Sequence, residues 1–164
     1  MTTPVITLWQ PWATFVIYGG KMIENRGWAP PKKIMGKVNG IHAGKTFEKD
    51  IIEGMRDDDD PFFKEALRKC ESACGHPSEG PRGKIIGTAF LKGYLHQENG
   101  KNIYHRFGGK VFEIAPEKLP EKVLRWWDSH QYGWHYVNVR PLKKPIPAKG
   151  KQGIWNFDLP EDDQ

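Results

Sequence analysis

The sequence predicts an α+β fold in which a mixed, mostly antiparallel sheet curls towards a barrel and helices are inserted at its periphery. Three observations support this prediction. Five or six strand-like segments are spread along the chain, helical patterns interrupt them early and late, and nothing resembles a series of parallel strand–helix–strand units. At 164 residues, 38% of them hydrophobic, the chain is the size of one domain with its own core. We therefore expect a single domain over residues 1–160, followed by an acidic tail over residues 161–164.

The first quarter of the chain has the pattern of a strand, a helix and two further strands. Residues 5–8 read as a short strand. Pro11 occupies a favourable first position for a helix that a Gly-Gly pair terminates. Residues 21–26 form a turn that leads into a second strand, and residues 37–43 have the pattern of a third.

Two helices are expected next. Thr46 is placed to cap a helix with Ile52 and Met55 on its apolar face, and Asp60 with Pro61 opens another. The remainder contains, in order, a long strand, a shorter strand, a helix and two closing strands. These predicted segments are residues 83–95, 110–114, 120–128, 134–139 and 152–157.

The charge distribution favours a phosphate-binding surface. The net charge is +5, and two segments, residues 26–45 and residues 140–151, each contain five Lys or Arg and no acidic residue. A fold that brings these two segments together would present a positive surface suited to phosphates. The alternative is that both segments are solvated loops.

Several other protein classes lack support in the sequence. No apolar run approaches the roughly 18 residues of a membrane span, and the first residues do not resemble a signal peptide. Two cysteines make no disulfide framework, which favours a cytoplasmic protein. Cys70, Cys74 and His76 have a zinc-like spacing, but the cysteines fit the apolar stripe of a helix and no fourth ligand is evident. We therefore expect no membrane partner, no metal and no cofactor.

The most unusual segment is residues 19–26, Gly-Gly-Lys-Met-Ile-Glu-Asn-Arg. If its second half is extended, Glu24 and Arg26 lie on one face of a strand, and Lys21 in the preceding turn can reach the same side. Arg26 offers a planar fork for a phosphate or a base edge, Lys21 a mobile charge, and Glu24 an acceptor for the amine of a base. Buried together, the three groups would also suit Lys21 to act as a base of lowered pKa. The alternative is an ion-paired surface turn.

The same segment matches the pattern G-x-K-x-x-E-x-R, and in this it resembles the ASCH domain, a branch of the PUA-like superfamily. Further stretches resemble the family in its order along the chain. They are residues 8–13 (LWQPWA), 41–45 (IHAGK), and a C-terminal group of 132–134 (YGW), 145–150 (PIPAKG) and 153–155 (GIW). These matches bracket nearly the whole chain and leave mainly residues 46–82 and 96–130 as variable inserts.

This resemblance implies a PUA-like β-barrel whose cleft, between the barrel and the first helix, is lined by Lys21, Glu24 and Arg26. It also implies RNA binding, because family members are thought to bind RNA. One related branch hydrolyses acetylated cytidine with a threonine placed three residues after the motif lysine, and another member type has been proposed to cleave RNA. Here that position is Glu24, which has no hydroxyl, so the threonine mechanism is in doubt. A water-based mechanism with Lys21 or Glu24 as general base is the alternative.

Aromatic and basic residues elsewhere complete the predicted site. Tyr132, Trp134 and Trp9 are candidates to stack on a nucleobase, and a place in the core is the alternative for both tryptophans. Trp9 and Trp28 flank the motif in sequence and are candidates to form a wall of the site. His42 is a candidate acid or base, with a buried strand histidine as the alternative. The full set of candidate binding residues is Trp9, Lys21, Glu24, Arg26, His42, Lys45, Tyr132, Trp134 and Arg140.

Three hypotheses for function follow from the sequence. The first is a binding domain that holds RNA, a nucleotide or a nucleoside in the motif cleft. The second is a hydrolase that acts on a modified nucleoside or on RNA there, with Lys21 and Glu24 as the catalytic proton-transfer groups. The third is a module for a protein partner in which the motif residues form a structural ion pair.

Overall fold

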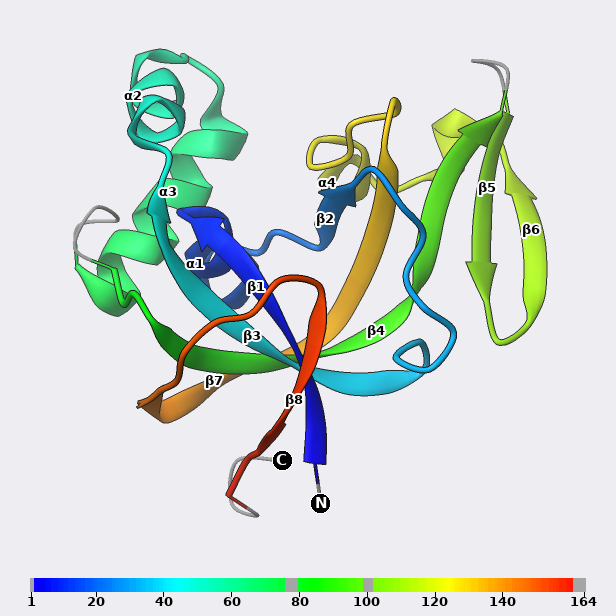
Figure 1. Cartoon of the computed structure of the whole chain (residues 1–164). Helices are drawn as coiled ribbons and strands as arrows, with labels where there is room; N and C mark the ends of the chain where they lie inside the picture. Colours follow the sequence, from blue (N-terminus) through cyan, green and yellow to red (C-terminus); the bar gives the residue numbers. More distant parts are fainter. Residues whose placement is uncertain (1, 76–79, 99–101, 161–164) are drawn as a thin grey trace. The chain divides into compact units, whose positions relative to one another are not determined.

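The computed structural model describes residues 2–75, 80–98 and 102–160 (Figure 1). The internal contacts divide the chain into two compact units. Unit 1 comprises Met1–Gly20, Asn39–Ala89 and Val139–Gln164, and unit 2 comprises Lys21–Val38 and Phe90–Asn138. Each unit is therefore built from segments that are distant in sequence. The predicted acidic tail, residues 161–164, lies outside the described residues.

The eight strands of the described residues form one mixed sheet, in the order β2-β7-β4-β3-β1-β8, with β5 paired to β4 and β6 paired to β5. β1 (Thr2–Gln10) runs parallel to β3 (Lys37–Phe47) and antiparallel to β8 (Ile154–Asp158). The predicted α+β class and mixed pairing are confirmed. In the described part of the chain the sheet is not closed into a barrel, because the path of paired strands ends at β2 on one side and at β8 on the other.

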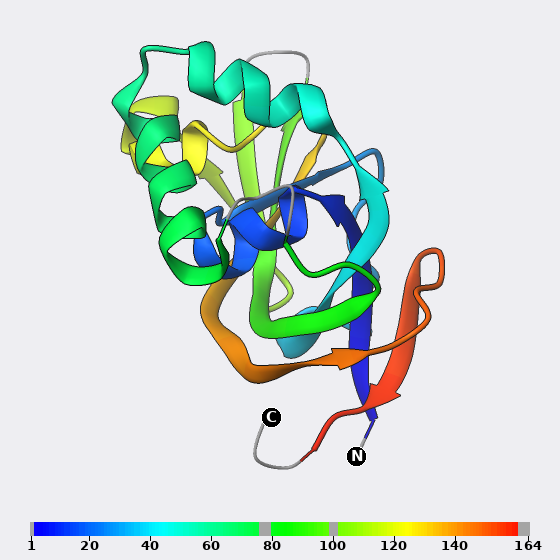
Figure 2. The same cartoon turned by 90° about the vertical axis from the view of Figure 1, so that its left-hand side faces the viewer.

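Within the described residues, unit 1 contains three α-helices, α1 (Trp12–Tyr18), α2 (Lys49–Asp57) and α3 (Pro61–Cys74), and α3 packs against both others (Figure 2). It also contains β1, β8, most of β3, the first part of β4 (Lys84–Glu98) and the last part of β7 (Tyr132–Pro147). Its strands share an apolar cluster. The buried members are Val5, Ile85, Leu142, Trp155 and Leu159. No helix in the described residues is long and apolar enough to cross a membrane.

Both ends of α1 depend on specific residues. The buried Gln10 side chain accepts hydrogen bonds from the backbone N–H (3.1 Å) and hydroxyl (3.0 Å) of Thr14, and it donates to the Pro81 carbonyl (2.7 Å). At the other end, a Cβ on Gly19 would lie 3.0 Å from the Cys70 sulfur. The same Cβ would lie 2.7 Å from the Phe15 side chain, so a larger residue would crowd both α1 and α3. The first glycine of the motif is therefore a packing residue.

The predicted helices are present at the expected places in the sequence, but some of them begin or end at other residues than predicted. Asp60 caps α3 as expected, since its side chain accepts from a backbone N–H of the first turn. Thr46 does not cap a helix, because β3 continues through it and α2 begins later. The helix expected over residues 120–128 shortens to α4 (Glu121–Leu124), which follows a 3-10 turn at Pro116–Lys118.

Unit 2 consists of β2 (Ile23–Arg26), the first part of β7, the last part of β4, the hairpin of β5 (Asn102–Phe107) and β6 (Lys110–Ile114), and α4 (Figure 1). The pairs β2–β7, β4–β5 and β5–β6 are all antiparallel. β6 was predicted as a strand, whereas β5 falls in residues 101–110, which the sequence indicated only as a candidate hairpin. The polar residues His105 and Arg106 occupy both faces of β5 and conceal its alternation.

Candidate functional site

Four predicted site residues meet on one face of unit 2. Glu24 and Arg26 lie on the same side of β2, as the extended motif requires. In the antiparallel register of β2 and β7, Trp134 is opposite Glu24 and Tyr132 is opposite Arg26. Directly opposite residues of such a pair project from the same face of a sheet. The segments around residues 24 and 133, far apart in sequence, thus contribute to one face of the sheet.

Lys21, Glu24 and Arg26 form a chain of ion pairs. Lys21 Nζ lies 3.1 Å from Glu24 Oε2 and also donates to the Ile23 carbonyl, while Arg26 Nε lies 3.2 Å from Glu24 Oε1. The exposed fraction of the side chain rises from 3% for Lys21 through 10% for Glu24 to 28% for Arg26. Burial lowers the pKa of Lys21, and the Glu24 carboxylate opposes that shift. Of these three ion-paired residues, Arg26 is therefore the one that a ligand can reach.

Tyr136 adds a polar group to the buried end of this face. The residue is fully buried, and its backbone N–H donates to the Met22 carbonyl at 2.8 Å. Its hydroxyl makes no hydrogen bond within the described residues. Burial raises the pKa of this hydroxyl, and the negative charge of Glu24 raises it further. The sequence signal for Tyr136 was its place on the same strand face as Trp134.

Trp134 does not present its ring to solvent. Its side chain is fully buried, and its indole N–H donates to the Trp28 carbonyl at 2.9 Å. The two indole rings pack edge to face with their centroids 4.8 Å apart. Trp28 is 40% exposed. Trp134 thus has the core position that the sequence left as an alternative, and Trp28 is the ring that a base could reach.

A cavity of about 420 Å³ is present in unit 2. Three of its lining residues are the aromatic Tyr94, His96 and Tyr132, and the His96 and Tyr132 rings are stacked with centroids 6.1 Å apart. Arg106 also lines it. The remaining lining residues are Ala29, Gln97, Glu98, Ser129, His130 and Gln131. Much of this lining comes from residues 96–130, which the sequence predicts to be a variable insert.

His96 is held as a neutral imidazole by its neighbours in the cavity. Arg106 donates from Nε to His96 Nε2 at 3.0 Å, so that this nitrogen accepts and the ring proton lies on Nδ1, 3.8 Å from the Glu98 carboxylate. Burial lowers the pKa of His96, and the charge of Arg106 lowers it further. The two terminal amino groups of Arg106 make no side-chain hydrogen bond within the described residues. They are therefore able to bind an anion.

The side chain of the motif residue Asn25 forms hydrogen bonds with the segment that leads into the turn lining the cavity. Its amide donates to the Trp126 carbonyl (2.9 Å) and accepts from the Asp128 N–H (2.9 Å). The Asp128 carboxylate accepts from the His130 N–H (2.9 Å) and from the Gln131 side chain (3.1 Å), and these bonds lower the pKa of Asp128. The motif strand and the cavity are thus connected by one set of hydrogen bonds.

Two glycines allow the close packing around the cavity. A Cβ on Gly93 would lie 2.1 Å from the Arg106 carbonyl oxygen, so β4 and β5 could not pair here with any other residue. A Cβ on Gly133 would lie 2.6 Å from the Trp127 ring. That ring donates from its N–H to the Gln131 carbonyl at 3.1 Å. Glycine at these two positions is therefore a condition for the shape of the cavity.

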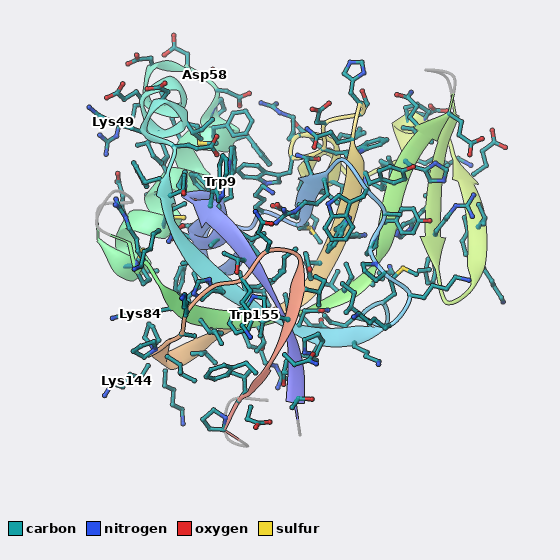
Figure 3. All side chains as sticks on the ribbon, in the orientation of Figure 1. Trp9, Lys49, Asp58, Lys84, Lys144 and Trp155 are labelled. Carbon is teal, nitrogen blue, oxygen red and sulfur yellow. The ribbon has the colours of Figure 1, made fainter. Side chains whose placement is uncertain are left out.

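The other predicted site residues belong to unit 1. Trp9, near the end of β1, is 56% exposed (Figure 3), and Lys45 and Arg140 are exposed on β3 and β7. His42 is fully buried in β3, and it donates from Nε2 to the Ala148 carbonyl at 2.9 Å. Burial lowers its pKa. His42 thus has the place of a buried strand histidine.

In unit 1 the end of the first acid-free basic segment meets the second one at Gly83. The Gly83 N–H donates to the Ala43 carbonyl (2.7 Å), and the Ala148 N–H donates to the Gly83 carbonyl (3.1 Å). Lys84 and Lys144 both point outward from the paired strands β4 and β7 (Figure 3). We call the cations of this region the basic surface. Its members are Lys45, Arg82, Lys84, Lys144 and Lys149.

The structure adds residues to the site that sequence reasoning missed. They are Asn25, Tyr94, His96, Arg106 and Tyr136. No known protein-family profile matches this chain, and no curated protein matches it. The chemistry of the site is therefore argued from its own geometry.

Proposed function

We propose that this chain binds RNA or a nucleotide, that Arg26 contacts the ligand, and that the fold is a variant of the PUA-like barrel of ASCH domains. The observation that carries the proposal is the buried Lys21–Glu24 pair, which holds the Arg26 guanidinium at the accessible end of the ion-pair chain. A guanidinium held in this way offers its donors to a phosphate or a base edge with little further loss of side-chain entropy.

The surroundings of Arg26 support a ligand that contains a base. Tyr132 is opposite Arg26 in the sheet, and Trp28 is partly exposed in the same unit. Proteins that recognise single-stranded RNA combine such rings with cationic side chains, because an unstacked base gains contact on an aromatic face. In this proposal Lys21 and Glu24 position Arg26 and do not themselves touch phosphate.

The basic surface of unit 1 supports a polyanionic ligand. It gathers five cations from three segments of the chain. Cations that neutralise backbone phosphates release condensed counterions, so the affinity for RNA should fall steeply as salt rises. A free nucleoside, which has no phosphate, would show little of this dependence.

Fluorescence anisotropy of a labelled single-stranded RNA, measured at two salt concentrations, tests the proposal. We expect salt-sensitive binding by the native protein and about tenfold weaker binding by Arg26→Gln, since one specific arginine contact contributes about 1–3 kcal/mol. Arg125→Gln, at the end of α4, is the matched control, because Arg125 lies outside the motif and the cavity lining and forms an ion pair with Glu121, and it should bind like the native protein. Equal affinities for the two variants would remove Arg26 from the site. Absence of binding to RNA and to nucleotides would favour a protein-partner module.

A hydrolase at the same face is the second candidate, and a specific observation favours it. Lys21 has a lowered pKa beside Glu24, and the Tyr136 hydroxyl nearby has no hydrogen-bond partner in the described residues. Such a set is suited to activate a water by general-base catalysis. The test is turnover of acetylated cytidine and of RNA by the native protein and by Glu24→Gln. Turnover that Glu24→Gln abolishes would establish an enzyme, whereas binding without turnover would leave a binding protein.

A further inference from the structure

The cavity in unit 2 is lined by none of the three ion-paired motif residues, and it has the size of a ligand site. Its volume of about 420 Å³ lies in the range of roughly 300–1,000 Å³ that small-molecule sites occupy. It lies among the end of β4, β5 and the turn before β7, and its lining includes neither Lys21 nor Arg26. Its chemistry therefore needs an explanation of its own.

One part of the cavity is suited to a planar ring. Tyr94, His96 and Tyr132 bring three aromatic rings to it, with neighbouring centroids 5.8–6.1 Å apart. His96 is fixed in orientation by Arg106 and is kept neutral, so it presents an uncharged ring. Stacking of this kind accepts any nucleobase, because every base has a π-face.

Other residues of the cavity are suited to two further groups, an anion and the polar edge of a planar ring. The terminal amino groups of Arg106 form a planar fork that matches the oxygens of a phosphate. Gln97, Ser129 and Gln131 add amide and hydroxyl groups that can donate to, or accept from, the edge of a base. An aromatic wall, a guanidinium fork and neutral polar groups are together the complement of one nucleotide.

We propose that this cavity holds a single unstacked nucleotide, with its base against Tyr94 and Tyr132 and its phosphate on Arg106. The inference rests on the proposed function and deepens it, because it assigns one nucleotide of the ligand to residues outside the motif. The same chemistry is carried by a free nucleoside monophosphate and by one residue of an RNA chain, and the experiment separates these two sources.

The test is a titration of isotope-labelled protein with each of the four nucleoside 5′-monophosphates, followed by two-dimensional amide NMR. We expect saturable shifts of signals from residues that line the cavity, such as His96 and Gln131. Inorganic phosphate is the control probe and should shift these signals far less. Equal shifts with phosphate alone would overturn the assignment of a base to the cavity, and no shift with any monophosphate would overturn the subsite.

Variants then locate the two contacts. Tyr132→Ala and Arg106→Gln should each weaken monophosphate binding about tenfold, in line with the loss of one stacked base or one bidentate contact. The matched controls are Phe112→Ala, an exposed aromatic of β6, and Arg68→Gln, an exposed arginine of α3. Both controls should bind like the native protein. A well-dispersed spectrum for each variant shows that it is folded, and Arg106→Lys, which keeps the charge without the fork, should give an intermediate affinity.

RNA titrations with the same variants distinguish failure of the subsite from failure of the proposed function. If RNA binds and Arg26→Gln weakens it, while the Tyr132 and Arg106 variants bind RNA normally, the subsite is overturned and the proposed function stands. If monophosphates bind in the cavity and RNA does not bind at all, the subsite stands with a free nucleotide as its ligand. Loss of both RNA and monophosphate binding in the two cavity variants supports the subsite as part of the RNA site.

Discussion

Lys21 illustrates how burial changes the role of a charged residue. A lysine that binds phosphate directly needs a solvent-accessible ammonium group, whereas only 3% of the Lys21 side chain is exposed and Glu24 neutralises it. Two buried opposite charges stabilise each other, but either one alone would be strongly destabilising. The sequence identifies both partners through their spacing. Their burial, which makes them positioning groups for Arg26, depends on β7 packing beside β2 and is not visible in the motif.

Replacement of Lys21 by methionine tests this role. Lys21→Met keeps the length of the side chain and removes the charge, so Glu24 loses the partner of its inner oxygen. We expect the free energy of unfolding to fall by about 3 kcal/mol, the loss typical of breaking a buried ion pair. Urea denaturation followed by tryptophan fluorescence measures this change. The matched control is Lys49→Met, an exposed lysine paired with Glu53, which should change the stability by less than about 1 kcal/mol. Similar effects of the two substitutions would argue against a structural role for Lys21.

At the scale of elements, β5 decides the shape of the cavity. Alternation in the sequence predicts which residues of a strand share a face, and it placed Glu24 with Arg26 correctly. It does not predict which strands pair. Arg106 and His96 come together only because Tyr94 of β4 is in register with Arg106 of β5. The pairing of β4 with β5 could not be predicted, since β5 has polar residues on both faces.

A glycine substitution tests the importance of the β4–β5 pairing. Gly93→Ala places a Cβ about where the Arg106 carbonyl oxygen lies, so the two strands must separate. We expect a loss of about 2–3 kcal/mol in stability, within the range of a severe steric change, and loss of monophosphate binding. Gly27→Ala is the control within the same unit, because nothing lies within 4 Å of its added Cβ. Thermal unfolding of both variants provides the comparison, and equal melting temperatures would contradict the account.

β5 and β7 contribute a pair of histidines that should make stability depend on pH. The rings of His105 and His135 lie 5.4 Å apart, and neither Nε2 has a hydrogen-bond partner within the described residues. Burial, together with the charge of Lys92, lowers the pKa of both to about 4. In the unfolded chain, with a pKa of about 6.5, each binds a proton more readily. Their contribution to stability is therefore complete above about pH 6.5 and is lost as the pH falls towards 4.

The melting temperature measured between pH 7 and pH 4 checks this prediction. His135→Gln removes one of the two titrating groups, so its melting temperature should fall less steeply over this interval than that of the native protein. His130→Gln, at an exposed histidine of the turn before β7, should follow the native curve. If the native protein and His135→Gln show parallel curves, the pair does not contribute to the pH dependence.

For the whole molecule, the two units offer complementary chemistry. Unit 1 presents the basic surface, and unit 2 presents Arg26, Trp28 and the aromatic cavity. The charge pattern of the sequence indicated a positive surface if the two basic segments came together, and the hydrogen bonds at Gly83 bring Lys45 and Lys149 into one region. The aromatic part was predicted through Tyr132 and Trp28, but the exposure of Trp28 and the burial of Trp134 were not, because both result from packing between distant segments.

The central claim is that bases of an RNA ligand contact the aromatic side chains of unit 2. Ultraviolet crosslinking of the native protein to single-stranded RNA, with the crosslinked peptides identified by mass spectrometry, tests it most directly. We predict crosslinks to the peptides that contain Trp28, Tyr94 and Tyr132, and we predict that Arg26→Gln reduces them. Crosslinks confined to peptides of unit 1, or crosslinks in unit 2 that are insensitive to Arg26→Gln, would contradict the account.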